Sequence, residues 1–387
     1  MKFSKRTDWA NTPNPLTEAI ARKRQSNQPL IDLTESNPTR CSFKYLNADL
    51  LEPLRDLRNL VYEPDPRGLL EAREAVCEYY AAKNVKLDPR QIFLTAGTSE
   101  AYAFLFRLLL DPGDKAVVPQ PSYPLFDYLA DLNDVRLERY PLLYENGWRI
   151  DVSRAEAPLL VLVNPNNPTG NFVRENEREA INRLCGEKGA AIISDEVFID
   201  FPIGGKGTKN FTFAGNKEIL SFALGGVSKI LGLPQMKLSW IAASGPPPLW
   251  EEAVERLEII ADTYLSVNTP CQRALSEWFK KRGRVIEEMR DRLLVNQRYL
   301  ESKFKNSAGA PFAALLQSEG GWYSVLQIQS GLSDEELALR LIQNQNVIVH
   351  PGYFFDFEKE NFLVLSLLLP EVLFQKGVDA LGEGLKN

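Results

Sequence analysis

Short apolar runs alternate with amphipathic stretches through the middle of this chain. The runs are rich in Val, Ile and Leu, which is typical of strands buried on both faces of a parallel sheet. Helical spacing over about 100–110 and about 175–187 places helices between some of them. The alternation predicts βαβ units and therefore an α/β fold. The apolar pattern predicts strands over residues 91–97, 116–123, 159–165, 190–197, 218–226 and 237–244.

A longer helical pattern, over about 270–305, follows the last of these strands. Beyond it the order of the elements is mixed, which indicates a smaller α+β unit over 306–387. Its helix should begin after Ser333, which is placed as an N-cap. The elements expected in this unit are strands within 319–328 and 346–350 and a helix within 332–344.

Composition and charge are those of an ordinary globular protein. Apolar residues make up 44% and charged residues 25% of the 387 positions, so the chain can bury a sizeable core. The net charge of −6 argues against a nucleic-acid partner, which needs clustered Lys and Arg to contact phosphates. A small-molecule substrate is more consistent with this net charge than a nucleic acid is.

No segment of the chain predicts export or membrane insertion. Residues 1–16 carry basic side chains but no apolar run after them, unlike a signal peptide. The longest apolar runs, such as 362–369, are too short to cross a bilayer. Scattered cysteines without a CxxC motif are typical of free thiols, so we expect a cytoplasmic protein. The cysteines are Cys41, Cys77, Cys185 and Cys271.

Two kinds of catalytic site are disfavoured by the residues present. The chain has one histidine, His350, which excludes a His-rich metal site, and we expect no metal. The run GVSKI at 226–230 approaches a nucleophile elbow but lacks its closing glycine. A serine hydrolase is therefore set aside.

Polar residues that follow the predicted strands are candidates for a ligand site, because ligands of open α/β sheets bind at the carboxyl ends of the strands. Thr98 and Ser99 open a helix after the first strand, where backbone N–H groups and hydroxyls suit a phosphate, although a plain helix cap is the commoner reason for such residues. Tyr123, after the second strand, is either a stacking platform or a core aromatic. The run NPNNPTG at 164–170 consists of turn formers, which favours a tight loop.

Asp195 and Lys229 carry the strongest chemical signal. Asp195 follows a buried apolar strand, where a carboxylate is costly unless it is paired, so we interpret it as a ligand group. The next strand leads to Ser228 and Lys229. Together the strand ends supply an anion cup, an aromatic ring, an amide, a carboxylate and an amine. This set suits pyridoxal 5′-phosphate, whose aldehyde forms a Schiff base with a lysine and whose ring nitrogen stays protonated beside a carboxylate.

On the basis of these residues, the chain resembles the pyridoxal-phosphate-dependent aminotransferases of fold type I, class I/II. The resemblance covers nearly the whole chain and rests on NPNNPTG, SDEV and SK-x-x-GLPQ-x-K, in that order. It implies a large α/β domain over 36–280, with a mostly parallel seven-stranded sheet. A small α+β domain would be built from 1–35 and 281–387. The family usually forms homodimers whose active sites lie at the subunit interface.

The resemblance assigns a role to each strand-end residue. Lys229 matches the Schiff-base lysine, which also moves the proton of the reacting carbon. Asp195 matches the partner of the ring nitrogen, Asn167 the donor to the phenolic oxygen, and Tyr123 the stacking aromatic. Tyr62, in YEPDPRGLLEARE, matches a tyrosine that reaches the phosphate of the other subunit. The phosphate cup would comprise Thr98, Ser99, Ser228 and Lys237.

Two departures from the family pattern concern the cofactor. Phe198 stands where the family usually has a tyrosine that donates to the phenolic oxygen. Losing that donor removes one stabiliser of the phenolate, so we expect a Schiff base with a raised pKa. Lys237 stands where an arginine normally holds the phosphate, and lysine offers a point charge in place of a planar fork.

The largest departure concerns the substrate. The family commonly has Arg-Leu-Ser near the C-terminus, and that arginine binds the substrate α-carboxylate as a bidentate pair. The matching run here is 364–366, Val-Leu-Ser, and no arginine follows Arg340. Arg40 is our candidate for holding the carboxylate elsewhere; alternatively, the amino donor carries no α-carboxylate. Aromatic residues at 353–357 either line an apolar substrate pocket or belong to the core.

The predicted function is transfer of an amino group from an amino acid or related amine to a keto acid, through a Lys229 Schiff base and pyridoxamine phosphate. An alternative is a lyase on the same cofactor, such as one that eliminates across a carbon–sulfur bond. A non-enzymatic cofactor-binding regulator is disfavoured, because only about 30 residues precede the family core and they lack a basic helix-turn-helix pattern.

Overall fold

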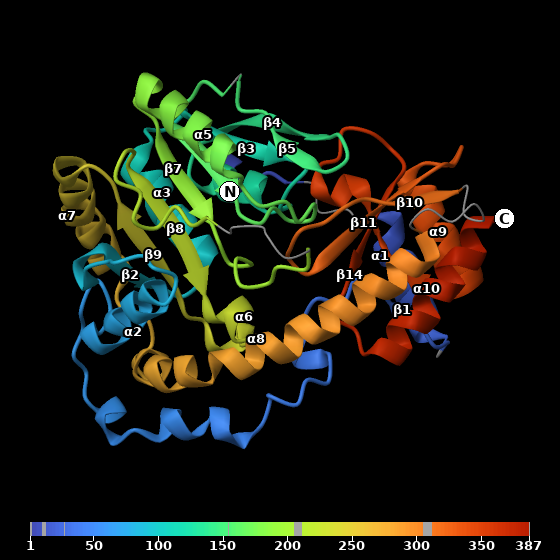
Figure 1. Ribbon diagram of the computed structural model, residues 1–387, viewed down its shortest axis with the longest axis horizontal. Coiled ribbons are helices and arrows are strands. Elements are labelled where there is room, and N and C mark those ends of the chain that lie inside the picture. The colour runs from blue at the N-terminus through green and yellow to red at the C-terminus, as the bar shows by residue number, and fades with distance from the viewer. Residues whose placement is uncertain are drawn as a thin grey trace.

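The two larger of the three β-sheets in the described residues, of eight and four strands, lie in two lobes set side by side (Figure 1). The computed structural model describes residues 2–9, 13–26, 28–153, 155–204, 211–304 and 312–386. Within this part of the chain, no helix combines the length and the apolar composition that a membrane span needs. Its His, Cys, Asp and Glu side chains nowhere gather into a group of three that could hold a metal ion.

The larger sheet has the strand order β2-β9-β8-β7-β6-β3-β4-β5. Neighbours from β8 to β4 run parallel, whereas β2, β9 and β5 pair antiparallel. The expected α/β class with a mainly parallel sheet is confirmed. The strands are β2 (Ile92–Thr95), β3 (Lys115–Gln120), β4 (Arg136–Tyr144), β5 (Trp148–Ile150), β6 (Leu159–Val163), β7 (Ala191–Asp195), β8 (Ser221–Gly226) and β9 (Ser239–Ser244).

All six strands predicted from the apolar pattern are present, and the pattern missed β4 and β5. Strand β4 carries alternating charged residues and lies near the edge of the sheet, where its side chains are only partly buried. The short strand β5 folds back on β4 as a hairpin. It brings the sheet to eight strands, against the seven expected.

The apolar runs are continuous because helices cover both faces of this sheet. Along β6, Leu160 and Leu162 belong to one buried cluster and Leu159, Val161 and Val163 to the other. One face packs on α2, α5 and α8, the opposite face on α3, α4 and α7. Each buried Leu or Val contributes roughly 1.5–3 kcal/mol of transfer free energy. The helices of this lobe are α2 (Leu70–Ala81), α3 (Thr98–Leu109), α4 (Phe126–Leu132), α5 (Glu175–Lys188) and α7 (Pro247–Tyr264).

The smaller sheet is antiparallel, in the order β10-β11-β14-β13. The N-terminal helix α1 packs on α9, and β1 (Ile31–Asp32) pairs with β12 (Val347–Ile348), so the N-terminal segment joins this lobe. The elements are β10 (Ala313–Leu315), β11 (Tyr323–Ile328), β13 (His350–Pro351), β14 (Phe362–Ser366), α1 (Pro15–Gln25), α9 (Asp334–Gln345) and α10 (Glu371–Lys386).

Helix α9 begins as its sequence predicts. The Ser333 hydroxyl accepts a hydrogen bond from the Glu336 backbone N–H at 3.3 Å, and the Glu336 carboxylate accepts one from the Ser333 N–H at 2.8 Å. This reciprocal capping box satisfies two N–H groups that a helix start otherwise leaves unpaired. The N-cap assignment of Ser333 is confirmed.

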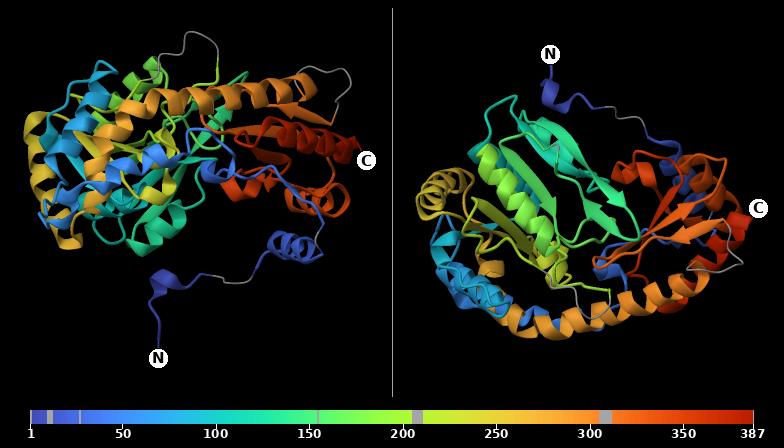
Figure 2. Two further views of the ribbon diagram at one scale, coloured as in Figure 1. Left: turned by 90° about the horizontal axis from the view of Figure 1, so that it is seen from below. Right: turned by 45° about the horizontal axis from the view of Figure 1, so that its top comes forward.

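Helix α8 (Thr269–Phe304) runs along both lobes (Figure 2). Near its start, the Trp278 indole donates to the Leu50 carbonyl at 2.9 Å. Near its end, Asn296 donates to the carbonyls of Leu367 and Leu369, and Gln297 accepts from the Ser324 hydroxyl of β11 at 2.5 Å. The single expected helix over 270–305 is present, and the boundary expected near residue 280 falls inside it.

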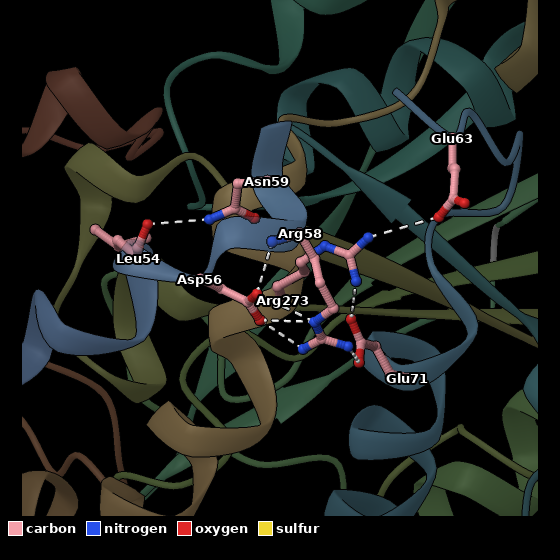
Figure 3. A network of polar contacts seen from close by, with 7 residues as sticks. All are labelled: Leu54, Asp56, Arg58, Asn59, Glu63, Glu71 and Arg273. Atoms are coloured by element: carbon pink, nitrogen blue, oxygen red, sulfur yellow. Dashed lines mark hydrogen bonds and ion pairs between the residues drawn. The ribbon is translucent and has the colours of Figure 1, made fainter. Parts of the chain in front are cut away.

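Arg273, in the first turns of α8, anchors the loop that carries Tyr62 (Figure 3). Its side chain is buried, donates to Glu71 at 3.0 Å and lies 3.6 Å from Glu63. Arg58 joins the network by pairing with Asp56 at 2.5 Å and with Glu71 at 3.2 Å. Buried charges need such partners, and here they tie the 56–71 segment to α8.

Candidate active site

Lys229 lies at the carboxyl edge of the larger sheet. Strand β8 ends at Gly226, and Lys229 belongs to the short helix α6 (Val227–Ile230) that follows. Asp195 is the last residue of the neighbouring strand β7. Because β7 and β8 run parallel, both side chains leave the same edge of the sheet.

A cavity of about 540 Å³ adjoins Lys229. Ser228 and Lys229 line it from the larger lobe, and His350 of β13 lines it from the smaller one. Arg40, in the short helix η2 (Pro38–Arg40), lines it as well. Three residues expected at the site from sequence, Ser228, Lys229 and Arg40, therefore share one cavity.

Asp195 is a buried carboxyl group with few partners. The Tyr102 hydroxyl of α3 donates to it at 3.2 Å, and the Val197 backbone N–H donates at 3.3 Å. Burial raises the pKa of Asp195 to about 6, although these hydrogen bonds and the positive charge of Lys229 act in the opposite direction. The site is thus prepared to stabilise a cationic group that approaches the carboxylate.

Lys229 faces two aromatic rings. Its Nζ lies 5.2 Å from the ring centre of Phe198 and 4.7 Å from that of Trp322. Burial lowers the pKa of Lys229 to about 8, and the charge of Asp195 opposes that shift. A larger fraction of the amine is therefore neutral, and nucleophilic, near neutral pH than for an exposed lysine.

The start of α3 forms a cup of unpaired N–H groups. The first N–H groups with a carbonyl partner in this helix are those of Glu100 and Ala101, which leaves the preceding ones free to bind an anion. The Lys237 Nζ lies 3.6 Å from the point that a Cβ on Gly97 would occupy. Thr98, Ser99 and Lys237, all expected at a phosphate, are thus brought together.

Asn167 has a buried side-chain oxygen without a hydrogen-bond partner among the described residues. Its neighbours in the 164–170 loop are used structurally: Asn164 accepts from the Val173 N–H at 3.0 Å, and Asn166 donates to the Thr169 hydroxyl at 2.8 Å. The loop is tight, as its turn-forming residues predict. The Asn167 side chain is buried, yet its Oδ1 has no hydrogen-bond partner among the described residues. A buried polar atom without a partner is costly, which favours a ligand here.

Tyr123 lies close enough to Asp195 to be influenced by its charge, and neither Tyr123 nor Tyr62 lines the cavity at Lys229. Burial, and after it the charge of Asp195, raises the pKa of Tyr123 to about 12, and its ring packs edge-on against Phe126 at 5.9 Å. Tyr62 follows the short helix η5 (Leu57–Leu60), and 73% of its surface is exposed. The Tyr62 side chain therefore points away from the interior of its own chain.

The wall that the smaller lobe supplies was not predicted from sequence. His350 lines the cavity, the Trp322 ring centre lies 4.7 Å from the Lys229 Nζ, and the Tyr323 ring lies 6.5 Å from that of Phe198. Tyr102 of α3 was also missed, because its helical spacing is that of an ordinary core residue. Of the aromatic cluster at 353–357, Phe355 is buried with its ring 6.0 Å from that of Tyr323. The spacing of the aromatic residues at 353–357 in the sequence did not indicate that Phe355 would be the buried one.

Proteins of known structure share this fold. An alanine aminotransferase from Pyrococcus furiosus superposes with a TM-score of 0.89, at 23% identity and with all of both chains covered. An aspartate aminotransferase from Thermotoga maritima superposes with a TM-score of 0.83, at 21% identity and with all of both chains covered. At such identities the likeness establishes the fold.

Relatives by sequence extend the comparison. A glutamate-pyruvate aminotransferase of Haemophilus influenzae is 23% identical over 91% of this chain and 90% of its own length. An S-alkyl-thiohydroximate lyase of Arabidopsis thaliana is 26% identical over 84% of this chain and 74% of its own length. The sequence model of the aminotransferase class I and II family matches residues 25–381, and the chain belongs to that family.

Proposed function

We propose that this protein is an aminotransferase that uses pyridoxal 5′-phosphate to move an amino group from an amino donor to a keto-acid acceptor. The observation that carries the proposal is the meeting of Lys229 and Asp195 at the carboxyl edge of the larger sheet, where each influences the titration of the other. An amine whose pKa is lowered to about 8 stands there beside a buried carboxyl. Lysines perturbed in this way are typical of covalent capture of a carbonyl compound.

The residues present fit the cofactor part by part. The N–H groups at the start of α3, with Thr98, Ser99, Ser228 and Lys237, would hold the phosphate. Asp195 would pair with the ring nitrogen. Asn167, whose buried Oδ1 has no partner, would donate from its Nδ2 to the phenolic oxygen. The ring of Tyr123 would stack on the cofactor ring.

When bound, the cofactor supplies an aldehyde that captures amines and a ring that withdraws electrons. Lys229 Nζ then acts as the general base, removing the proton from the carbon that bears the donor's amino group and later returning a proton. Asp195 would stabilise the cationic ring, and the Tyr102 hydroxyl, which donates to this carboxylate at 3.2 Å, would orient it. Phe198 and Trp322 exclude water from the side of Lys229 that they cover.

A lyase that acts through the same residues is the second candidate. It is favoured by the similarity to the thiohydroximate lyase of Arabidopsis thaliana. In both reactions Lys229 removes a proton, so the geometry at Asp195 and Lys229 serves either outcome. The products differ: a transaminase leaves pyridoxamine phosphate on the protein, whereas a β-eliminating lyase releases a keto acid and ammonia.

We also propose that the working form is a homodimer in the cytoplasm. Leu57, Leu60 and Val61 are large apolar side chains that stand exposed beside Tyr62 on the segment held by Arg273. Exposed apolar surface of this kind marks an interface. A partner that covers it would receive Tyr62 at its own phosphate. All four cysteines are free, which fits a reducing compartment.

Replacement of Lys229 tests the catalytic assignment. Lys229→Ala should slow donor conversion at least about 10³-fold, because both the covalent attachment and the general base are lost. Borohydride treatment should attach the cofactor to the Lys229 peptide of the natural protein alone, as read by mass spectrometry. As the control, Lys237→Ala should weaken cofactor binding and still convert donor at saturating cofactor. Donor conversion by Lys229→Ala at the natural rate would refute the proposal.

The pKa of Lys229 can be measured directly in the cofactor-free protein. Competitive acetylation, followed by peptide mass spectrometry, should place the midpoint for Lys229 near pH 8. Asp195→Asn should lower this midpoint by about one unit, because the negative charge favours the ammonium form. Glu196→Gln removes a neighbouring buried carboxyl that plays no part in the shift of Lys229, and should leave the midpoint in place. A midpoint that rises in Asp195→Asn would contradict the coupling.

Phe198 should set the pH response of the loaded protein. Phe198→Tyr introduces a hydroxyl where a donor to the phenolic oxygen is expected, so the midpoint of the visible absorbance change should fall by about one pH unit. Phe198→Leu introduces no donor and should not lower it. Equal midpoints for Phe198→Tyr and the natural protein would show that the residue does not face the phenolic oxygen.

Charge placed on the exposed segment should separate the subunits. We expect the natural protein to sediment as a dimer and Leu57→Asp/Leu60→Asp to sediment as a monomer, since two carboxylates would be buried without partners. The monomer should bind the cofactor at least about tenfold more weakly, because it loses the partner's Tyr62. Val372→Asp, an exposed site on α10, is the control for charge alone. A dimeric double variant would place the interface elsewhere.

A further inference from the structure

Two carboxylates of the N-terminal segment line the cavity that Lys229 also lines. Asp32 is the last residue of β1, and Glu35 lies between β1 and the short helix η2. Strand β1 pairs with β12 of the smaller lobe, so the backbone that leads to both side chains is held by a sheet. Each carboxylate is half-buried, with 33% of the Asp32 side chain and 26% of the Glu35 side chain exposed. A ligand in the cavity can therefore reach both.

One oxygen of each carboxylate is held by a backbone N–H group close to it in the sequence. The Thr34 N–H donates to Asp32 Oδ1 at 3.0 Å, and the Asn37 N–H donates to Glu35 Oε1 at 2.9 Å. These local hydrogen bonds restrict the orientation of each carboxylate. Both groups are therefore oriented by the protein itself.

The other oxygen of each carboxylate has a long ion pair in the described part of the chain. Asp32 Oδ2 lies 3.9 Å from the Arg24 guanidinium, and Glu35 Oε2 lies 3.8 Å from that of Arg40. The two arginine side chains are mostly exposed, and exposed ion pairs contribute little free energy. A cation on a ligand can therefore replace the arginine at either oxygen.

The charges that line this cavity favour a cationic group on the ligand. Burial lowers the pKa of His350 to about 4, with Asp32 opposing the shift, so this imidazole is neutral near neutral pH. Once the cofactor engages the amine of Lys229, the described lining retains two carboxylates against the exposed guanidinium of Arg40. A cleft with an excess of one sign of charge concentrates ligands of the opposite sign.

We propose that the amino donor is an α-amino acid whose side chain carries a positive charge, which Asp32 and Glu35 receive. This rests on the proposed aminotransferase function. Arg40 serves the α-carboxylates of donor and acceptor alike, because the two half-reactions run in opposite directions through the same site. As the α-carboxylate engages Arg40, Glu35 exchanges its long pair for the side-chain cation, so no charge is left without a partner.

The reaction balances for a donor with a second ammonium group. It is ⁺H₃N–R–CH(NH₃⁺)–COO⁻ + R′–CO–COO⁻ → ⁺H₃N–R–CO–COO⁻ + R′–CH(NH₃⁺)–COO⁻. Atoms and net charge are equal on both sides, so no external oxidant or reductant is needed. The side-chain cation is kept in the keto-acid product, and the acceptor needs no charge beyond its α-carboxylate.

Three donors of similar length test the charge preference. L-Norleucine is L-lysine without the terminal ammonium group, and L-2-aminoadipate carries a carboxylate at that end. The loss of cofactor absorbance reports each donor half-reaction at equal concentration. L-Lysine should react at least about fivefold faster than L-norleucine and at least about fiftyfold faster than L-2-aminoadipate, because opposite charges attract across the cavity and like charges repel.

A labelled donor shows which amino group is transferred. L-Lysine that carries heavy nitrogen at the α-position should convert pyruvate to labelled alanine, as read by mass spectrometry. Unlabelled alanine would show that the terminal amino group reacts instead, with the α-amino group away from Lys229, and would overturn the inference.

Removing the two carboxylates should abolish the preference. Asp32→Asn/Glu35→Gln should reduce the rate ratio of L-lysine to L-norleucine to about one. Glu18→Gln is the matched control and should keep the natural ratio, because Glu18 pairs with Arg22 at 3.4 Å on the same N-terminal segment and does not line the cavity. If the double variant does not fold, Glu35→Lys, at a loop position, should favour L-2-aminoadipate over L-lysine.

The failure of this inference can be told apart from the failure of the proposed function. Equal or faster reaction of L-norleucine in the natural protein would overturn the inference and leave the aminotransferase in place. A lysine preference that survives in Asp32→Asn/Glu35→Gln would also overturn it, because other groups would then select the cation. Failure of every donor, L-alanine included, to change the absorbance would instead refute the aminotransferase.

Discussion

The burial of Asp195 and Lys229 at one edge of the large sheet is the constraint on which the rest of the site depends. Taking either charge out of water is costly, and the raised pKa of Asp195 and lowered pKa of Lys229 express that cost. Neither group is satisfied by a close ion pair in the protein alone. A ligand that brings a cationic ring to the carboxyl and an aldehyde to the amine would relieve both penalties, so the burial of these two groups favours such a ligand.

The two-sided packing of the sheet makes this burial possible. Helices cover both faces, so the strands are apolar throughout and polar groups appear only where the strands end. Asp195 and the Asn167 loop are therefore held by backbone fixed within the core. Helix α8 joins this sheet to the smaller one through Gln297 and Asn296, which places the second wall of the cavity on a rigid support.

Because helices cover both faces of the large sheet, its central strands and the polar residues that follow them could be predicted from sequence. Continuous apolar strands and the polar residues that end them are local signals, and they predicted β6, β7 and β8 with Asp195 and Lys229. Strand β4 was missed because its charged residues interrupt the apolar pattern from which the other strands were predicted. Trp322, Tyr102 and His350 could not be assigned, since their contacts depend on how distant elements pack. The run at 364–366 lacks the arginine that the resemblance implies, and the structure buries Val364 completely within β14.

The aromatic rings that face Lys229 come from both lobes. Phe198 follows β7 of the large lobe and Trp322 precedes β11 of the smaller one, and their ring centres lie 5.2 and 4.7 Å from the Lys229 Nζ. The polar groups suited to the cofactor, Asp195 and Asn167, belong to the large lobe and are retained. The groups suited to hold the cofactor thus lie in the large lobe, whereas the smaller lobe adds His350 to the cavity at Lys229. Changes in the smaller lobe can therefore alter this cavity without altering the electrostatics that the chemistry needs.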